Sequence, residues 1–518
     1  MAPCFLCKGT EKFHDFLLLS VFFIFPTRKY NKSAVSSVIR VMKKTIFLSA
    51  LLSVAFVACT DGDAFSTSPN RRLTFSTDTV RLDTVFSRVP TSTRTFWVYN
   101  HSGSGLRLAN VRLQNGNQTG YRVNVDGSWL SSTAGFQVSD LEVRDKDSCR
   151  VFVELTSAFN GKDTPQKVED NLVFTLESGV EQKVCLSALS WDADVIRSLT
   201  LERDTTLEKG KPVIVYGGIT VPEGRTLTLR PGVTLYFHAD AGLRVDGTLH
   251  AEGTPEENVT LRGDRLDRMF DYLPYDGVSG QWQGVRFGTS SFGNVISYTD
   301  IHSTMDGVVC DSSALDRQKL TMTGSIVHNC NGTGVKLRSV RATLDNCQLS
   351  NTLGACFQAE GGDVSLNGCT LAQFYPFDAN RGPALAFANH DDTYDLPLTL
   401  SVRNSIVTGW ANDVVEGSVK DSTVAFDYHI DHSILRTPKD STDERLTDVT
   451  FEDVKDTARY GERLFRLVDA DLQRFDFRLS RHSAAIGLAD PMTALPADRK
   501  GVRRDDKPDL GCYQHEEE

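Results

Sequence analysis

The chain has 518 residues, of which 40% are hydrophobic and 24% are charged, and its formal net charge at pH 7 is −11. These proportions are typical of a soluble globular protein with room for two or three domains. The acidic balance argues against a nucleic acid as partner, because phosphate binding needs a basic surface. Beyond residue 60, no apolar run approaches the length of about 18 residues that a membrane-spanning helix needs.

The segment that starts at Met42, MKKTIFLSALLSVAFVAC, has the layout of a bacterial signal peptide. Two lysines precede an apolar stretch, and the small residue Ala58 precedes Cys59. We expect residues 42–58 to be a lipoprotein signal, cleaved after Ala58, with a lipid attached to Cys59. An ordinary cleaved signal, in which Cys59 is incidental, is the alternative. The lipid would anchor the protein at the outer membrane or cell surface.

Residues 1–41 contain a second apolar patch, FLLLSVFFIF, which charged residues separate from the signal. We interpret 1–41 as a mis-called N-terminal extension and Met42 as the natural start. Residues 59–69 are mostly small and polar, as suits a flexible tether between a lipid and a folded domain.

Residues 70–195 contain longer alternating strands, such as TFWVYNHSG, LRLANVRL and SCRVFVEL, with turn signals between them. Several short strands at regular spacing predict a β-sandwich. Trp97 falls within this alternation and is expected in the core, although a carbohydrate-binding sandwich would expose it. Cys149 and Cys185 lie in the same segment and could either pair or remain free. Residues 77–113 resemble the immunoglobulin-like domains of Gram-negative surface lipoproteins, which usually act as spacers.

Further along, one short pattern recurs at intervals of 22 to 36 residues. TLDNCQLS at 343–350 reappears as SLNGCTLA at 365–372. Repeats of 20–50 residues are typical of solenoids and propellers. Aligned repeats form a column of small residues, which we call the small-residue column: Ser325, Cys347, Cys369, Ser405 and Ser433, with Asp300 expected at its start.

Each repeat predicts a strand, a one-residue bend and a second strand. Leu344 and Cys347 are three positions apart, so both can point inward only if the chain bends between them. The residue before the small one is Gly or Asn in the four clearest repeats, and these residues adopt a left-handed backbone most readily. We therefore predict a parallel β-helix over 196–436, whose stacked rungs bury one continuous core. The 36-residue step between Cys369 and Ser405 requires a rung with a protruding loop.

The stretch GQWQGVRFGTSSFGNVISYTDIHSTMDGVV at 280–309 resembles the rungs of right-handed β-helices of the pectate-lyase-like superfamily. The sequences DFRLSRHSAAIGLAD and ADRKGVRRDDKPDLGCYQ resemble the closing segment of the same family, here residues 437–518. The implied fold is all-β, with an N-terminal β-sandwich followed by a right-handed parallel β-helix. That fold contains lyases, hydrolases, epimerases and inert binders, so the resemblance specifies no activity.

Lyase or glycosidase chemistry on this fold would need clustered carboxylates at matching positions of neighbouring rungs. The column two residues before the small-residue column reads Tyr298, Thr323, Asp345, Asn367, Arg403 and Asp431, without an adjacent carboxylate pair. This favours a monomeric envelope protein that binds a polysaccharide or a surface protein without catalysis. A polysaccharide lyase or glycoside hydrolase, and a purely structural envelope protein, are the alternatives.

The best candidate for a ligand site is the loop FANHDDTYDLP at 387–397, the protrusion expected from the long repeat. Its candidate ligand-binding residues, with one residue from the following segment, are His390, Asp391, Asp392, Tyr394, Asp395 and Trp410. Calcium prefers oxygen ligands, so Asp391, Asp392 and Asp395 are the candidate calcium ligands and no other cofactor is expected. A solvated insertion without a ligand is the alternative.

A second insertion, at 264–282, contains Tyr272, Tyr275 and Trp282. These aromatic residues could build a binding platform or a lid over the core, and the family resemblance favours the structural role.

Overall fold

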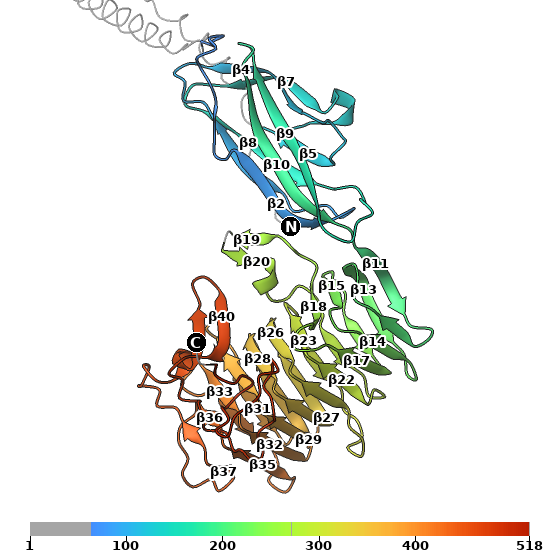
Figure 1. Ribbon diagram of the computed structural model, residues 1–518, viewed down its shortest axis with the longest axis vertical. Coiled ribbons are helices and arrows are strands. Elements are labelled where there is room, and N and C mark those ends of the chain that lie inside the picture. The colour runs from blue at the N-terminus through green and yellow to red at the C-terminus, as the bar shows by residue number, and fades with distance from the viewer. Residues whose placement is uncertain (1–63, 271, 517–518) are drawn as a thin grey trace, which may run out of the picture. The chain divides into compact units, whose positions relative to one another are not determined.

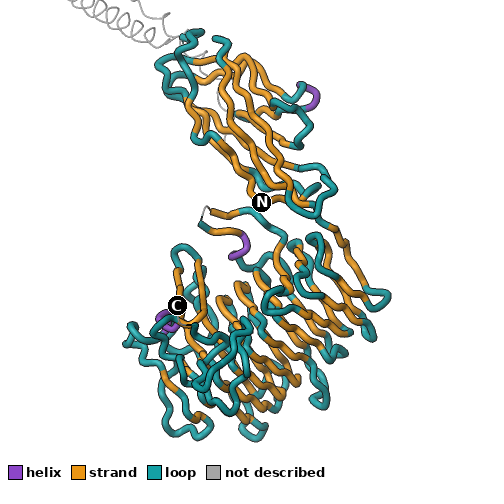
Figure 2. Tube along the Cα trace, viewed as in Figure 1, coloured by secondary structure: helices purple, strands orange, loops and turns teal. Residues whose placement is uncertain are grey.

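The computed structural model describes residues 64–270 and 272–516. The expected extension, signal peptide and lipidated Cys59 lie outside these residues and stay predictions. The described chain consists mainly of β-strands and loops, with three short 3-10 segments (Figures 1 and 2). No helix within it has the length and apolar character needed to cross a membrane.

The N-terminal part is a β-sandwich of two five-stranded sheets whose facing apolar side chains form one buried core. The first sheet contains, in spatial order, β1 (Thr74–Phe75), β3 (Arg94–Tyr99), β8 (Ser148–Leu155), β5 (Tyr121–Val125) and β6 (Ser128–Trp129). The second contains β2 (Thr79–Phe86), β10 (Glu181–Trp191), β9 (Gln166–Leu176), β4 (Leu106–Leu113) and β7 (Gln137–Val143), and η1 (Ser132–Ala134) precedes β7.

Trp97 is not part of this core. Phe96 and Val98 are buried, whereas 40% of Trp97 is exposed, because successive residues of a strand face opposite sides of the sheet. The expectation of a buried Trp97 is therefore wrong. Cys149 and Cys185 are free thiols on β8 and β10, which belong to different sheets.

The following part is a parallel β-helix, a single coiled sheet of 26 strands from β11 (Asp194–Thr200) to β38 (Thr450–Phe451). Its strands form three stacks, and β11 and β13 (Val213–Val221) contribute to the first and third. The first stack continues with β16 (Leu243–Val245), β21 (Val285–Phe287), β24 (Val308–Cys310), the first halves of β27 (Val335–Asp345) and β29 (Phe357–Asn367), β31 (Leu385–Ala388) and β34 (Val415–Ser418).

The second stack contains β12 (Thr205–Leu207), β14 (Thr226–Leu229), β17 (Thr248–Glu252), β22 (Asn294–Ser297), β25 (Leu320–Thr323), the second halves of β27 and β29, β32 (Leu398–Arg403), β35 (Phe426–Asp431) and β37 (Leu446–Thr447). The third contains β15 (Thr234–Phe237), β18 (Val259–Gly263), β23 (Thr299–His302), β26 (Ile326–Cys330), β28 (Gln348–Thr352), β30 (Thr370–Gln373), β33 (Ile406–Gly409), β36 (Ile434–Leu435) and β38. Inward apolar side chains of all three stacks share one core.

The bend between the second and third stacks has the predicted geometry. The φ angles are 57° at Gly324, 51° at Asn346, 62° at Gly368 and 49° at Asn404, all in the left-handed region. The small residues that follow these positions are buried. The buried hydroxyl groups of the small-residue column form hydrogen bonds there. For example, the backbone amide of Cys369 donates a hydrogen bond to Oγ of Ser405, in the next rung, at 3.0 Å.

The earliest of the predicted repeats is shifted by one residue from the expected register. Thr299 occupies the small-residue position, since it is buried and its amide donates to Ser325 Oγ at 3.1 Å. The left-handed residue before it is Tyr298, with φ of 42°. Because side chains alternate, a slip of one residue turns Asp300 to the outside of the coil. The prediction that Asp300 begins the small-residue column is therefore wrong.

The part of the closing segment that follows β38 packs against the outer surface of the third stack and forms a second hydrophobic core there. It contains η3 (Gly461–Leu464) and the antiparallel hairpin of β39 (Phe465–Asp469) and β40 (Arg474–Leu479). The insertion after β18 contains β19 (Arg268–Phe270), β20 (Leu273–Pro274) and η2 (Tyr275–Gly277). Trp282 at its end is buried and stacks on Phe237, with ring centroids 4.2 Å apart, so Trp282 is a core residue.

Candidate functional site

Two alanines on β31 form the floor of a pocket on the first stack. Outward positions of β29, β31 and β34 align in two rows across the strands, Gln358–Ala386–Glu416 and Glu360–Ala388–Ser418. Neighbouring strands are about 4.8 Å apart, so the short alanine side chains leave a hollow between the side chains on either side. The pocket has a volume of about 370 Å³.

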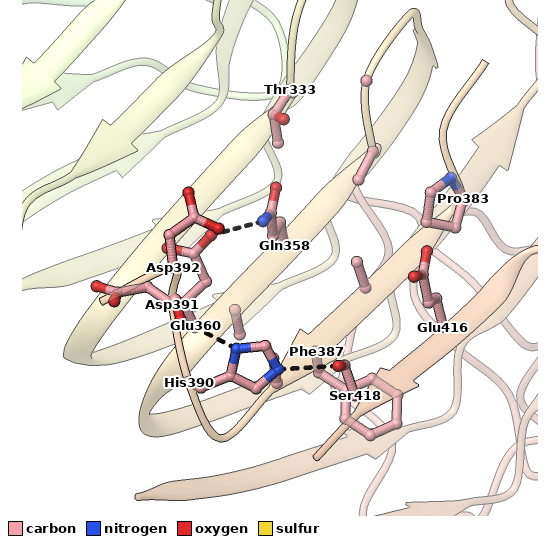
Figure 3. Close-up of a pocket in the computed structure, with 15 residues that line it drawn as sticks. Thr333, Gln358, Glu360, Pro383, Phe387, His390, Asp391, Asp392, Glu416 and Ser418 are labelled. Atoms are coloured by element: carbon pink, nitrogen blue, oxygen red, sulfur yellow. Dashed lines mark hydrogen bonds between the residues drawn. The ribbon is translucent and has the colours of Figure 1, made fainter. Parts of the chain in front are cut away.

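The loop between β31 and β32 forms one wall of this pocket. His390, Asp391 and Asp392 line it together with Phe387 (Figure 3). The loop is closed on itself by a backbone bridge between His390 and Asp395. Three of the six predicted ligand-binding residues therefore do lie together in one pocket.

Asp391 holds the loop to the β-helix. Its Oδ2 accepts a hydrogen bond of 2.6 Å from Arg338 Nε, and Arg338 Nη2 contacts the same oxygen. Its Oδ1 accepts the amides of Thr393 at 2.7 Å and Tyr394 at 2.6 Å. Desolvation would raise the pKa of Asp391, but the Tyr394 and Thr393 amides and the Arg338 guanidinium together lower it. Asp391 is thus ionised, and both of its carboxylate oxygens already accept hydrogen bonds from neighbouring residues.

Four carboxylates line the pocket, from Glu360, Asp391, Asp392 and Glu416. Two are neutralised, because Lys336 Nζ lies 2.9 Å from Glu360 and Arg338 pairs with Asp391. Asp392 and Glu416 are exposed, and neither has an ion-pair partner within the described chain. These two carboxylates give the pocket an uncompensated negative charge.

His390 is fixed in one orientation at the edge of the pocket. Its Nδ1 lies 3.0 Å from the carbonyl oxygen of Asp391, and its Nε2 lies 2.9 Å from Ser418 Oγ. Because a carbonyl can only accept, Nδ1 carries the hydrogen, and in the neutral ring Nε2 accepts the Ser418 hydroxyl. The hydrogen bond between His390 and Ser418 therefore holds both side chains in place beside the floor of the pocket.

The other predicted residues lie outside the pocket lining. Tyr394 is 59% exposed, with the Arg338 guanidinium 5.7 Å from its ring centroid. Asp395 lies 3.9 Å from Lys420. Trp410 belongs to contacts with the closing segment, where its indole N–H donates to Glu462 at 2.6 Å.

Calcium binding by Asp391, Asp392 and Asp395 stays a prediction, and Asp391 has little capacity left for an ion. Across residues 64–270 and 272–516, only Asp300, His302 and His328 form a group of three His, Cys, Asp or Glu residues whose ligand atoms lie within 4.8 Å of one another.

The strand residues of the pocket were missed because the repeat pattern marks only the bend between the second and third stacks. A signal was present in FQAE (357–360), LAFA (385–388) and VEGS (415–418), which share one alternation. Aligning these segments would have placed Glu360, Ala388 and Ser418 in one row across the strands.

The match to a family model agrees with this fold, and no comparison shows an activity for this chain. The family described as "Right handed beta helix region" matches residues 256–410. A family 123 glycoside hydrolase from Clostridium perfringens is 8% identical, with 23% of this chain and only 25% of that chain covered and a TM-score of 0.16. The catalytic unit of the GH87 alpha-1,3-glucanase from Streptomyces thermodiastaticus strain HF3-3 is 9% identical, with 70% and 90% covered and a TM-score of 0.20.

Among curated proteins, no match was found. Structural likenesses this weak carry no argument about chemistry. The family match covers the strands β29 and β31 and the loop beside them, so most of the pocket lies within a right-handed parallel β-helix.

Proposed function

We propose that this protein is a lipid-anchored component of the cell envelope whose β-helix binds a glycan in the pocket above Ala386 and Ala388. The observation that carries the proposal is the hollow that these alanines leave between polar side chains on the neighbouring strands. Sugars present many hydroxyl groups, and ionised carboxylates such as those of Asp392 and Glu416 accept strong hydrogen bonds from them. The pocket volume is within the range of small-molecule sites.

The charge of the pocket favours a neutral or amino-bearing sugar. Two of its four carboxylates lack a cationic partner within the described chain, so the carboxylate of a uronic acid would be repelled. A neutral sugar suffers no such repulsion, and an amino sugar would gain an ion pair. We therefore expect binding to neutral or amino-bearing polysaccharides and not to polyuronates.

The test fills the hollow without removing a polar group. Ala388→Trp places a large ring over the pocket floor, at a position whose side chain faces outward and is free of core packing constraints. We expect at least a tenfold weaker Kd for a bound polysaccharide in calorimetric titration. Thr399→Trp, at an exposed position of β32, is the matched control and should bind as the wild type does. Equal binding by the Ala388→Trp variant would place the glycan elsewhere.

A glycoside hydrolase is the second candidate, because Asp392 and Glu416 line the same pocket without ion-pair partners of their own in the described chain (Figure 3). Glycoside hydrolysis generally uses two carboxylates on either side of the scissile bond. New reducing ends from a neutral polysaccharide, lost in Glu416→Gln, would establish hydrolysis. Unsaturated products from a polyuronate would instead establish a lyase, and binding without any product would favour the non-catalytic function.

The membrane anchor is supported by the signal-like sequence before Cys59. Lipid chains attached there would hold the protein at the membrane, since stable anchoring takes at least two membrane signals and a modified cysteine carries more than one chain. We expect Cys59→Ala to move the protein from the detergent phase to the aqueous phase in partitioning. Unchanged partitioning would exclude the lipid anchor and leave the glycan proposal untouched.

A further inference from the structure

Asp300, His302 and His328 lie together on the outward side of the third stack, where His302 is buried, and none of them lines the glycan pocket. His302 on β23 and His328 on β26 are in register, and their ring centroids are 4.7 Å apart. Oδ1 of Asp300 lies 2.9 Å from His302 Nδ1 and 3.2 Å from His328 Nε2. The three ligand atoms all lie within 4.8 Å of one another.

These separations suit a tetrahedral metal ion. Zinc binds imidazole nitrogen and carboxylate oxygen at about 2.0–2.2 Å, which places neighbouring ligand atoms about 3.3 Å apart in a tetrahedron. Both distances from Asp300 are close to that value. The two imidazole nitrogens lie within 4.8 Å of each other, so the side chains would have to rotate for all three atoms to face one ion.

The outer ring nitrogens are also held as they are in metal sites. His302 Nε2 lies 2.7 Å from Asp276 Oδ1, and His328 Nδ1 lies 3.1 Å from Asn329 Oδ1. Metal-binding histidines almost always donate their second N–H to a carboxylate, carbonyl or water. Donation to these two oxygens leaves His302 Nδ1 and His328 Nε2, the nitrogens that face Asp300, as the metal ligands.

We propose that Asp300, His302 and His328 bind a divalent transition-metal ion, with zinc the best fit, and that Asp276 and Asn329 orient the two imidazoles. Two nitrogens and one oxygen favour zinc over calcium or magnesium, which prefer oxygen ligands throughout. Three protein ligands leave a fourth position for water or a ligand. The site does not depend on the proposed glycan binding.

The metal would also fasten the insertion at 264–282 to the β-helix. Asp276 belongs to η2 of that insertion, and Arg262 Nη2 lies 2.8 Å from its Oδ1. Ser303 Oγ donates to the Asp276 carbonyl at 2.7 Å. An ion that binds only the folded arrangement stabilises it, so zinc should raise the unfolding temperature and slow amide exchange in η2.

The experiment is a titration of the purified full-length protein with zinc after removal of metals by a chelator. We expect one zinc per chain, with a micromolar or tighter Kd, and visible absorption typical of tetrahedral coordination when cobalt replaces zinc. His328→Ala should weaken zinc binding at least tenfold. Asp276→Asn, which keeps all three ligands, should weaken it about tenfold through loss of orientation. His250→Ala, a histidine outside the cluster, is the matched control and should bind normally.

Two results would overturn the proposal. One is a wild-type protein that takes up no stoichiometric zinc, which would make the cluster a hydrogen-bonded network in which His302 is protonated between Asp276 and Asp300. The other is equal zinc affinity in the wild type, Asp276→Asn and a folded His328→Ala variant. If His328→Ala does not fold, the zinc stoichiometry of the wild type and the affinity of Asp276→Asn still decide.

Discussion

The hydroxyl of Tyr513 donates a hydrogen bond to Oε1 of Gln348 at a distance of 2.9 Å, although 165 positions separate the two residues. Gln348 lies on β28 in the third stack, and Tyr513 belongs to the closing segment; both side chains are buried. Beside them, the amide of Cys512 donates to Thr370 Oγ1 at 3.1 Å. The closing segment is thus tied to two successive rungs by polar contacts next to an apolar core.

We expect Tyr513→Phe to lower the free energy of unfolding by about 1–2 kcal/mol, because it leaves a buried acceptor without its donor. Urea unfolding measures the loss, and faster amide exchange in β28 and β30 would locate it. Tyr394→Phe removes a hydroxyl from a residue that is 59% exposed and should change neither quantity. Equal effects of the two variants would mean that the Tyr513 hydrogen bond contributes nothing.

The interior of the coil offers a second prediction. Leu366 is fully buried in the β-helix core, whereas the neighbouring Ser365 faces outward. Leu366→Asp should therefore destabilise the protein by several kcal/mol, because it buries an unpaired charge. Ser365→Asp adds the same charge one position earlier and should shift the thermal midpoint only slightly. Similar midpoints for the two variants would contradict the register.

The register of these rungs could be predicted because their chemistry is local. A small residue three positions after an apolar one, with Gly or Asn between, encodes a left-handed bend whatever lies around it. The contact between Tyr513 and Gln348 has no such signal, since no periodicity relates the closing segment to the rungs. The strand residues of the pocket were missed for the same reason. They lie on strands of the first stack, beside Ala386 and Ala388, and the repeat pattern does not mark these strands.

The candidate site was predicted in part for the same reason. An interval of 36 residues had to contain a loop, and His390, Asp391 and Asp392 were identified from the composition of that loop. Arg338, which donates a hydrogen bond to Asp391, comes from β27, two strands before β31 in the first stack. The Asp300 cluster was missed because a shift of one residue assigned its carboxylate to the core.

The bend itself gives a third prediction. Gly368 has φ of 62°, and a Cβ atom added there would lie 3.0 Å from Asn346 Oδ1. Left-handed backbone costs a residue with a Cβ atom about 1–2 kcal/mol, so Gly368→Ala should lower stability by at least that amount. Gly210→Ala is the control, because its added Cβ atom would have only one neighbour, at 3.9 Å. Comparable urea midpoints for the two variants would contradict the strain.

A fourth prediction concerns the loop that lines the pocket. Arg338→Met keeps much of the arginine side-chain length but removes the hydrogen bonds to Asp391. We expect faster amide exchange at Thr393 and Tyr394 and weaker glycan binding, since the wall of the pocket loses its link to β27. Arg341→Met removes another ion pair on the same strand, with Asp363 at 3.0 Å, and should leave the loop unchanged. Unaltered exchange in Arg338→Met would show that the turn is stable without the arginine.

The last prediction uses a carboxylate near the C-terminal end of the coil. Asp443 Oδ1 accepts a hydrogen bond of 2.6 Å from Arg445 Nε, and Oδ2 accepts the hydroxyl of Tyr428. The hydrogen bond from Arg445 has the largest influence and, with Tyr428, lowers the pKa of Asp443 to about 2 against the opposing effect of burial. An unfolded aspartate has a pKa of about 3.9.

Because the folded pKa is the lower one, the ionised form of Asp443 contributes stability that is fully present above about pH 4–5 and is lost as the pH falls toward 2. Asp443→Asn should therefore lower the thermal midpoint at neutral pH, and its difference from the wild type should shrink between about pH 4 and pH 2. Asp427→Asn, at an exposed position on the neighbouring β35, should show a small difference at every pH. A constant difference for Asp443→Asn from pH 7 to pH 2 would mean that its effect is steric and does not come from the ionised carboxylate.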